Sequence, residues 1–264
     1  MNEEEFKDYI ARLTLAQEKH PLLFNVILFL LIAAGFAYLF LIIAVELILI
    51  FIMSVGAVFS SPLALVIAVL IGIVFIQTVR SVYRMIAFKV EPPDGILLNS
   101  QDSTELYKEI DCLRKEMNCE RVHKIYIVNE TRAYITQIPK FGIFGGYRNY
   151  LVLGMPLMFL LDRNQMKAVI AHELGHISRK HGHFSIWAVR MESVWTDTIK
   201  RMVWSTMLGE AFFMKFYRWF IMHLNARTFV IRRFFEKEAD QDASRLAGNQ
   251  VLADSLALLS IFDM

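Results

Sequence analysis

Residues 171–176 have the sequence AHELGH, a His-Glu-x-x-His pattern around which the fold is organised. His172 and His176 are four residues apart, so on a helix both imidazoles lie on one face and can bind one metal ion. Glu173 is rotated by about 100° from His172 and would flank that ion without joining the pair. Two imidazoles beside a carboxylate that can activate water are what a zinc hydrolase requires. The motif is short enough to arise by chance, so the surrounding sequence has to support it.

The residues before the motif predict the helix that the motif needs. Asp162, with Gln165 three residues later, has the pattern of a capping box at a helix start. Apolar residues then recur with helical spacing on one face, namely Met166, Val169, Ile170, Leu174 and Ile177. We expect a helix whose apolar face is buried, which would give the two histidines a rigid platform. Two ordinary surface histidines are the alternative, and the glutamate between them argues against it.

The overall composition indicates a membrane protein. The 264 residues are 56% hydrophobic, with a mean hydropathy of +0.42, which is too apolar for a soluble domain of this length. The formal net charge is only +2, so nothing suggests a nucleic-acid partner. Cys112 and Cys119 form neither a disulfide framework nor a CxxC metal pair. Reduced thiols in a cytosolic domain are the simplest interpretation.

Residues 22–77 form an almost continuous apolar run in which Glu46 is the one residue of formal charge. A membrane-spanning helix needs about 20 apolar residues, so the run is long enough for two helices. Serine, glycine and proline residues within 54–62 divide it, and we expect a helical hairpin of about 24–52 and 62–84. A buried pair of core helices is the alternative, and the length of the run argues against it.

The flanking charges predict how the 22–84 hairpin is oriented. Segment 1–21 is polar and lacks a signal-peptide pattern, so we expect a short cytosolic helix there. Basic residues flank the hairpin on both sides, whereas the connecting turn has no charge. Since basic residues favour the cytoplasmic side, the domain after residue 90 should be cytoplasmic, in a protein of the bacterial inner membrane. Glu46 would lie towards the far end of the first span. An intramembrane carboxylate is a candidate functional group, but a snorkelling or turn-facing side chain is our preferred interpretation.

Segment 91–264 predicts an α+β domain that is mostly α-helical. Its expected elements are a linker at 91–95, a helix capped by Asp102 or Ser103 with apolar residues Leu106, Ile110, Leu113 and Met117, and strands at 122–128, 133–135 and 150–153. The aromatic, glycine-rich stretch 141–147 is either a rim of the active site or a plain hairpin connection. The third strand leads into the motif helix, so helices and a small sheet form one compact layer.

The long aromatic segment 184–231 predicts a membrane-associated insertion. Within 203–224, three charged residues fall on one arc of a helical wheel and apolar residues cover most of the remainder. This indicates an amphipathic helix on or near the membrane, with a spanning helix whose polar stripe faces protein as the alternative. His181 and His183 follow the motif beyond its helical turn, and we interpret them as surface residues.

A second segment rich in carboxylates lies downstream. Residues 232–240 have the sequence RRFFEKEAD. A charged cluster is usually a solvated face, but a site with two histidines needs a third ligand, and these are the best placed carboxylates. Glu236 with Asp240, and Glu238 with Asp242, both have a spacing of four, so geometry leaves the register open. Small residues beside Glu236 would let two helices approach closely and favour the first pair.

Together the two motifs resemble those of membrane-embedded zinc metallopeptidases of the HtpX and CAAX-prenyl-endopeptidase type. The resemblance covers residues 91 to about 250 together with the N-terminal hairpin, and it implies a gluzincin-like domain. The roles that it implies are one Zn²⁺ bound by His172, His176 and Glu236, Glu173 as general base, and Asp240 as a residue that supports the site.

The chain departs from the family pattern at several points. Arg232 replaces the usual Ser of the second motif, and residues 131–134 replace an Asn-Ala-Phe edge-strand signature. Segment 184–231 fits poorly to the two spans that HtpX-like members place between the motifs. A further His region, which helps to stabilise the transition state, is not found before Met264. Either the chain is part of a longer one, or a Tyr or Arg serves that purpose.

The sequence therefore predicts a membrane-anchored zinc endopeptidase. Its polypeptide substrate would be a membrane or misfolded protein, cleaved at the cytosolic face of the lipid bilayer. A prenyl-protein protease would differ only in substrate. The alternative from another class is a zinc-binding membrane sensor or scaffold with a peptidase-like fold and little turnover.

Overall fold

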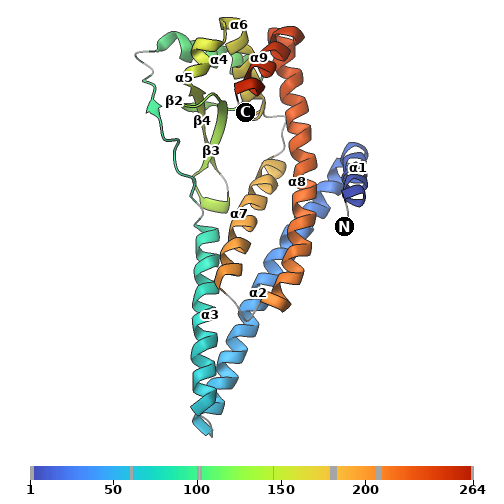
Figure 1. Ribbon diagram of the computed structural model, residues 1–264, viewed down its shortest axis with the longest axis vertical. Helices are drawn as coiled ribbons and strands as arrows, with labels where there is room; N and C mark the ends of the chain where they lie inside the picture. Colours follow the sequence, from blue (N-terminus) through green and yellow to red (C-terminus); the bar gives the residue numbers. More distant parts are fainter. Residues whose placement is uncertain are drawn as a thin grey trace. The chain divides into compact units, whose positions relative to one another are not determined.

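The structure is a computed structural model, and its fold divides the chain into two compact units. One unit comprises Met1–Phe88 with Phe184–Val230, and the other comprises Lys89–His183 with Ile231–Met264 (Figure 1). The residues described by the structure are 3–59, 62–87, 89–99, 101, 103–144, 146–178, 183–205 and 210–262.

The first unit is helical. It contains α1 (Glu3–Lys19), α2 (Pro21–Phe59), α3 (Pro62–Ile86), α7 (His183–Ser205) and the first part of α8 (Glu210–Ala247). Helices α2 and α3 pack along one another as a hairpin, as predicted. Among the described residues, Pro21–Gly56 and Leu63–Ile86 are the two stretches long and apolar enough to cross a membrane. Many of their large apolar side chains are exposed, Leu22 and Phe51 by 81% and 70%, which is consistent with contact to lipid.

The first predicted helix is too short at both ends. Pro21 occupies the first helical position, where its missing N–H has no helical partner to lose, so α2 begins before residue 24. The break expected at 54–56 is also wrong, because the helix continues to Phe59. Gly56 alone does not end a helix in such an apolar sequence.

Glu46 lies elsewhere than predicted. Its side chain is buried, with 7% exposed, and it accepts a hydrogen bond of 3.0 Å from Oγ1 of Thr78 on α3. The expectation of a snorkelling or turn-facing side chain is therefore wrong. A threonine on the facing helix offsets part of the cost of burying the carboxyl group.

The amphipathic helix predicted at 203–224 includes residues 206–209, which lie outside the described ones. On either side of them, α7 ends at Ser205 and α8 begins at Glu210. Helix α8 then continues into the carboxylate segment, because no Gly or Pro occurs between 210 and 247. Tyr217 and Phe220 of α8 are buried in the first unit, where Phe220 packs edge-on against Trp195 of α7, whereas Trp219 and Phe229 are exposed.

The second unit is a mixed sheet covered by helices, in agreement with the predicted mostly helical α+β class. Its strands are β1 (Ile96–Leu97), β2 (Val122–Val128), β3 (Ala133–Pro139) and β4 (Tyr147–Gly154), in the order β1-β2-β4-β3. Strand β2 is parallel to β4, and the other pairs are antiparallel. Strand β1 was not predicted, and two residues are too few for a recognisable pattern.

The helices of this unit are α4 (Thr104–Glu116), α5 (Met155–Leu160), α6 (Arg163–Gly175), the end of α8 and α9 (Asn249–Phe262). Leu151 in β4 is fully buried in a core with Leu113 of α4 and Leu174 of α6. The stretch between β3 and β4 contains a short 3-10 helix (Gly142–Phe144). It is a hairpin connection, one of the two predicted interpretations, and it is closed by a hydrogen bond from Lys140 N to Gly146 O.

The motif helix α6 begins with the predicted capping box. The Asp162 carboxylate accepts hydrogen bonds from the backbone N–H groups of Asn164 and Gln165, and the Gln165 side chain accepts one from Asp162 N. At the other end, α6 approaches α8 closely. A Cβ atom on Gly175 would lie 2.7 Å from Cα of Ala239, closer than two such atoms can pack.

We expect Gly175→Ala to destabilise the second unit by about 1–3 kcal/mol, because the added methyl forces α6 away from α8. The midpoint of thermal unfolding in detergent measures this. Gly72→Ala in α3 is the matched control, since a Cβ atom added there would have no neighbour within 4 Å and alanine favours a helix. Equal stability of Gly175→Ala and wild type would contradict the close contact.

Candidate active site

The two motif histidines lie at the end of α6. His172 is in its last turn, and His176 is the C-cap residue with φ −65° and ψ −19°, which are still helical values. The helical spacing of four is therefore kept, and the ring centroids are 5.0 Å apart with an angle of 88° between the planes. Both side chains are partly buried.

Glu236 reaches both imidazoles from α8. Its Oε2 lies 3.5 Å from Nε2 of His172 and 3.7 Å from Nε2 of His176. Ligands at about 2.0–2.2 Å from a tetrahedral zinc ion are separated from each other by about 3.3–3.5 Å. The Glu236 oxygen is thus spaced from each imidazole almost as two ligands of one zinc ion would be.

Asp240 lies on the opposite side of the His172 ring. Its Oδ1 is 3.0 Å from Nδ1 of His172, although neither atom makes a hydrogen bond of good geometry in this arrangement. A proton on Nδ1 would orient the ring and leave Nε2 free to bind a metal. A carboxylate behind a metal-binding histidine usually has this orienting role.

Glu173 is also close to the histidines. Its ligand atom and one nitrogen from each of His172 and His176 all lie within 4.8 Å of one another. Its carboxylate also has a backbone hydrogen bond with Ile135 of β3. Proximity alone therefore offers two carboxylates, Glu173 and Glu236, as the third ligand of a metal.

The match to known families is decisive for the class of protein. The model of peptidase family M48 matches residues 108–262, more than half of the chain and both motifs. No curated protein and no solved structure matches this chain.

The chain belongs to peptidase family M48.

It is therefore a metallopeptidase of the HtpX and CAAX-protease type, a class of zinc-dependent hydrolases, and the predicted family is confirmed. The two apolar helices are consistent with a membrane protein. Within this M48 chain, the donor set of imidazoles and carboxylates fits zinc, whose ligands in proteins are His, Cys, Asp and Glu.

Burial gives the carboxylates of this peptidase different proton affinities. Burial raises the pKa of Glu173 to about 7, although the nearby His172 favours its ionised form. The pKa of Glu236 is instead lowered, first by its hydrogen bond with His172. Burial alone would lower the pKa of His172, but the hydrogen bond with Glu236 and the surrounding carboxylates raise it overall. Three carboxylates around two imidazoles make a site that favours a cation.

The structure brings together the first of the two predicted carboxylate pairs. Glu236 and Asp240 both contact His172, whereas Asp242 lies 3.6 Å from Arg245 on its own helix. Ala239, between the two, is fully buried against Gly175. His181 lies outside the described residues, and of His183 only the backbone is described.

One participant was not predicted. The backbone of Ile135 meets the Glu173 carboxylate, so β3 borders the site. The alternating pattern at 133–135 indicated a strand, but a backbone group leaves no residue-type signal. The contact of Ile135 with Glu173 becomes understandable only from the sheet order, which places β3 at an edge.

Proposed function

We propose that this M48 protein is a membrane-anchored zinc endopeptidase in which His172, His176 and Glu236 bind Zn²⁺. The observation that carries the proposal is the position of Glu236 Oε2 within 3.7 Å of Nε2 of both histidines. A metal ligand must also be deprotonated, and the lowered pKa of Glu236 favours the carboxylate form.

Glu173 is the general base. Zinc, when bound, supplies Lewis acidity towards water and the scissile carbonyl. Glu173 takes a proton from the attacking water and later passes it to the leaving amine. A base works best when its pKa is near the working pH, and burial brings that of Glu173 to about 7. Its bond to the Ile135 backbone holds the carboxylate beside the histidines.

Asp240 is a positioning residue in this proposal. By holding the proton on Nδ1 of His172, it fixes the ring orientation and keeps Nε2 available. Because Asp240 and Glu236 are one helical turn apart on α8, the same helix supplies the ligand and the brace.

The sheet indicates how a polypeptide would lie at the site. Strand β3 is at the edge of the described sheet, and its Ile135 backbone borders Glu173. An extended peptide can pair with such an edge through main-chain hydrogen bonds. This supports a polypeptide substrate that is bound largely independently of its sequence, as membrane or misfolded proteins would require.

The membrane anchor is the α2–α3 hairpin. Lys7, Arg12 and Lys19 precede the hairpin. Arg80 and Arg84 lie in the last part of α3, and Lys89 follows it. Basic residues on both flanks favour a cytoplasmic location for both ends. We therefore place the peptidase unit at the cytosolic face of a bacterial inner membrane.

Exchange of the carboxylates tests the third ligand. We expect Glu236→Gln to lose most of the bound zinc and all zinc-dependent activity, because an amide oxygen is a weak, neutral ligand. Asp240→Asn should weaken zinc binding by about 10–100-fold, the usual effect of an outer partner. Glu238→Gln is the matched control and should keep its zinc. Metal analysis and a competition titration measure both effects. An empty site in Glu238→Gln with a filled one in Glu236→Gln would shift the ligand register by two residues.

Replacement of the base separates catalysis from metal binding. Glu173→Gln should lower the rate of casein cleavage by about 10²–10⁴-fold while zinc content stays near that of wild type, because Glu173 is not a ligand here. Wild type treated with a chelator is the control for complete loss of metal-dependent turnover. Loss of zinc in Glu173→Gln would assign this carboxylate to the metal. A wild type that binds zinc without cleaving any protein would favour the sensor or scaffold.

The orientation can be tested with protease added to spheroplasts. Tags at residue 1 and after residue 100 should be protected, and a cleavage site introduced at Gly56 should be accessible, because the basic flanks stay in the cytoplasm. Permeabilised cells, in which all three sites are cut, serve as the control. Cleavage of the residue-100 tag in intact spheroplasts would reverse the proposed orientation.

A further inference from the structure

A group of basic residues lies at one end of the sheet. The parallel strands β2 and β4 both begin at this end, and β3 finishes there, with Pro139 opposite Tyr147. We call the residues Arg121, His123, Lys140 and Arg148 the basic end. All four are exposed. In the described part of the chain, no ion pair joins Arg121, Lys140 or Arg148 to a carboxylate.

His123 shows how this end is built. The pairing of β2 with β4 shifts between Val122 and Lys124, and Nδ1 of His123 accepts the N–H of Asn149 at 3.2 Å. The imidazole nitrogen thus takes the place of a backbone carbonyl between β2 and β4. Because Nδ1 is the acceptor, the ring hydrogen is on Nε2. Burial lowers the pKa of His123, and the charges of Lys140, Arg121 and Arg148 lower it further, whereas a hydrogen bond with the Arg121 backbone acts in the opposite direction. His123 is therefore a polar ring that lies in a positive field and is held by the backbone on either side.

The carboxylate of Glu120, which precedes Arg121 in the sequence, is hydrogen-bonded to another residue. Glu120 accepts a hydrogen bond of 3.2 Å from Nδ2 of the fully buried Asn149, whose amide also donates to Arg121 O. With Glu120 counted against Arg121, Lys140 and Arg148, this corner keeps a positive charge.

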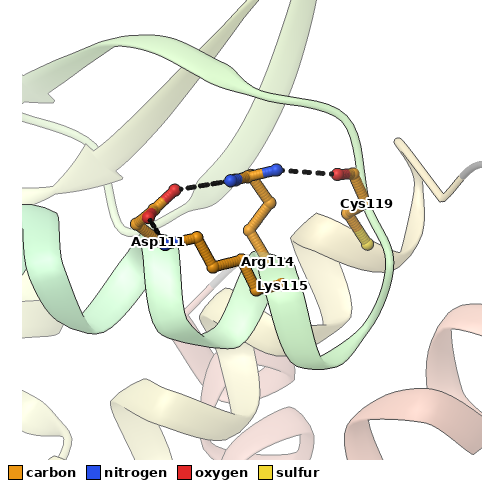
Figure 2. A network of polar contacts seen from close by, with 4 residues as sticks. All are labelled: Asp111, Arg114, Lys115 and Cys119. Atoms are coloured by element: carbon orange, nitrogen blue, oxygen red, sulfur yellow. Dashed lines mark hydrogen bonds and ion pairs between the residues drawn. The ribbon is translucent and has the colours of Figure 1, made fainter.

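A cavity of about 490 Å³ opens beside the basic end, and its lining includes Tyr107, Asp111, Arg114, Arg121 and His123. Arg114, one of the lining residues, is held by hydrogen bonds to Asp111 and Cys119 (Figure 2). Two of its N–H groups donate to Oδ1 of Asp111, at 2.9 and 2.7 Å, and a third donates to the carbonyl of Cys119. A guanidinium has five N–H donors, so two remain.

The Asp111 carboxylate does not make this cavity acidic. It is shared by two cations, because Nζ of Lys115 lies 2.7 Å from its other oxygen (Figure 2). Arg121 and His123 also line the cavity, together with apolar Ile110, Val122 and Ile125. The cavity therefore offers fixed donors and a positive charge to an anion the size of a phosphate group.

The hairpin loop adds an apolar residue to the basic end. Phe141 is 70% exposed although it follows Lys140 directly, and its ring lies against Gly146. An exposed aromatic ring next to a basic residue is typical of a surface that enters the headgroup region of a membrane. It is less suited to a purely polar ligand.

A short linker ties the sheet to the α2–α3 hairpin. Only residues 87–95 separate α3 from β1, so the start of β1 stays within about 35 Å of the end of α3 even when the linker is extended. Ile96 pairs with Ile127, so the basic end at the start of β2 lies about 17 Å further along the sheet. Such a short tether gives a high local concentration of lipid headgroups. This step rests on the proposed anchoring by α2 and α3.

We propose that the basic end binds anionic phospholipid headgroups, with phosphate at Arg114, Arg121 and His123 and with Phe141 in the interface. The bilayer that anchors the protein would thereby also orient the peptidase unit.

The test uses the full chain in nanodiscs that contain lipids with a quencher on the acyl chain. A bimane label is attached to Phe141→Cys in a Cys112→Ser background, which removes the exposed native thiol and keeps the buried Cys119. We expect strong quenching in discs with about one third phosphatidylglycerol and little in phosphatidylcholine alone. Equal quenching in both discs, or none in either, would overturn the proposal.

Charge variants supply the matched comparison. Arg121→Glu with Arg148→Glu should reduce the docked population strongly, since each basic residue near an anionic surface contributes about fivefold in affinity. Arg121→Gln with Arg148→Gln should act in the same direction. Arg163→Glu, an exposed cation at the start of α6, should leave quenching unchanged. Unfolding midpoints near that of wild type show that the variants fold. Quenching that is insensitive to both double variants would refute the proposal.

Inorganic phosphate distinguishes a headgroup from a soluble ion. At millimolar phosphate, with ionic strength matched by chloride, quenching in the anionic discs should persist, because the bilayer presents many headgroups to the whole basic end at once. Relief of quenching by phosphate but not by chloride would show that the cavity prefers the soluble ion, and it would overturn the assignment to lipid.

Discussion

The contact between α6 and α8 at Gly175 and Ala239 is the constraint on which the active site depends. A glycine on one helix and a fully buried alanine on the other allow the backbones to touch. On α8, Glu236 and Asp240 lie on either side of Ala239 in the sequence, so the approach delivers both carboxylates to His172 at once. A larger side chain at either position would separate ligands that must lie within a few ångströms.

The same approach makes the site electrostatically costly without a cation. Glu173 is partly buried and its pKa is raised to about 7 by burial, while Glu236 stays in its ionised form beside His172. Carboxylates brought out of water repel one another unless a positive charge compensates them. The packing of α6 on α8 and the binding of a divalent ion therefore favour each other, as in other proteins where metal binding is linked to folding.

Much of this unit could be predicted from local signals, and the exceptions have physical reasons. The capping box at Asp162 and the spacing of the motif fix α6, and small neighbours on α8 favoured Glu236 over Glu238. The length of α8 was not predicted, because the sequence changes from aromatic to acidic residues along it and so suggested two segments. The helix continues through this change because no Gly or Pro interrupts it. The burial of Glu46 depends on Thr78, 32 residues away, and no local pattern contains that partner.

The second unit carries opposite charges at separate places on one sheet. The carboxylates of the site border β3 at Ile135, whereas the basic end lies where β3 finishes at Pro139, four residues and roughly 14 Å further along the strand. At physiological salt, the interaction of exposed charges is screened over about 8 Å. Lys140, which follows β3 directly, is thus too distant to neutralise the Glu173 carboxylate. In the described part of the chain, no ion pair joins Arg121, Lys140 or Arg148 to a carboxylate, so these cations remain available to an external anion.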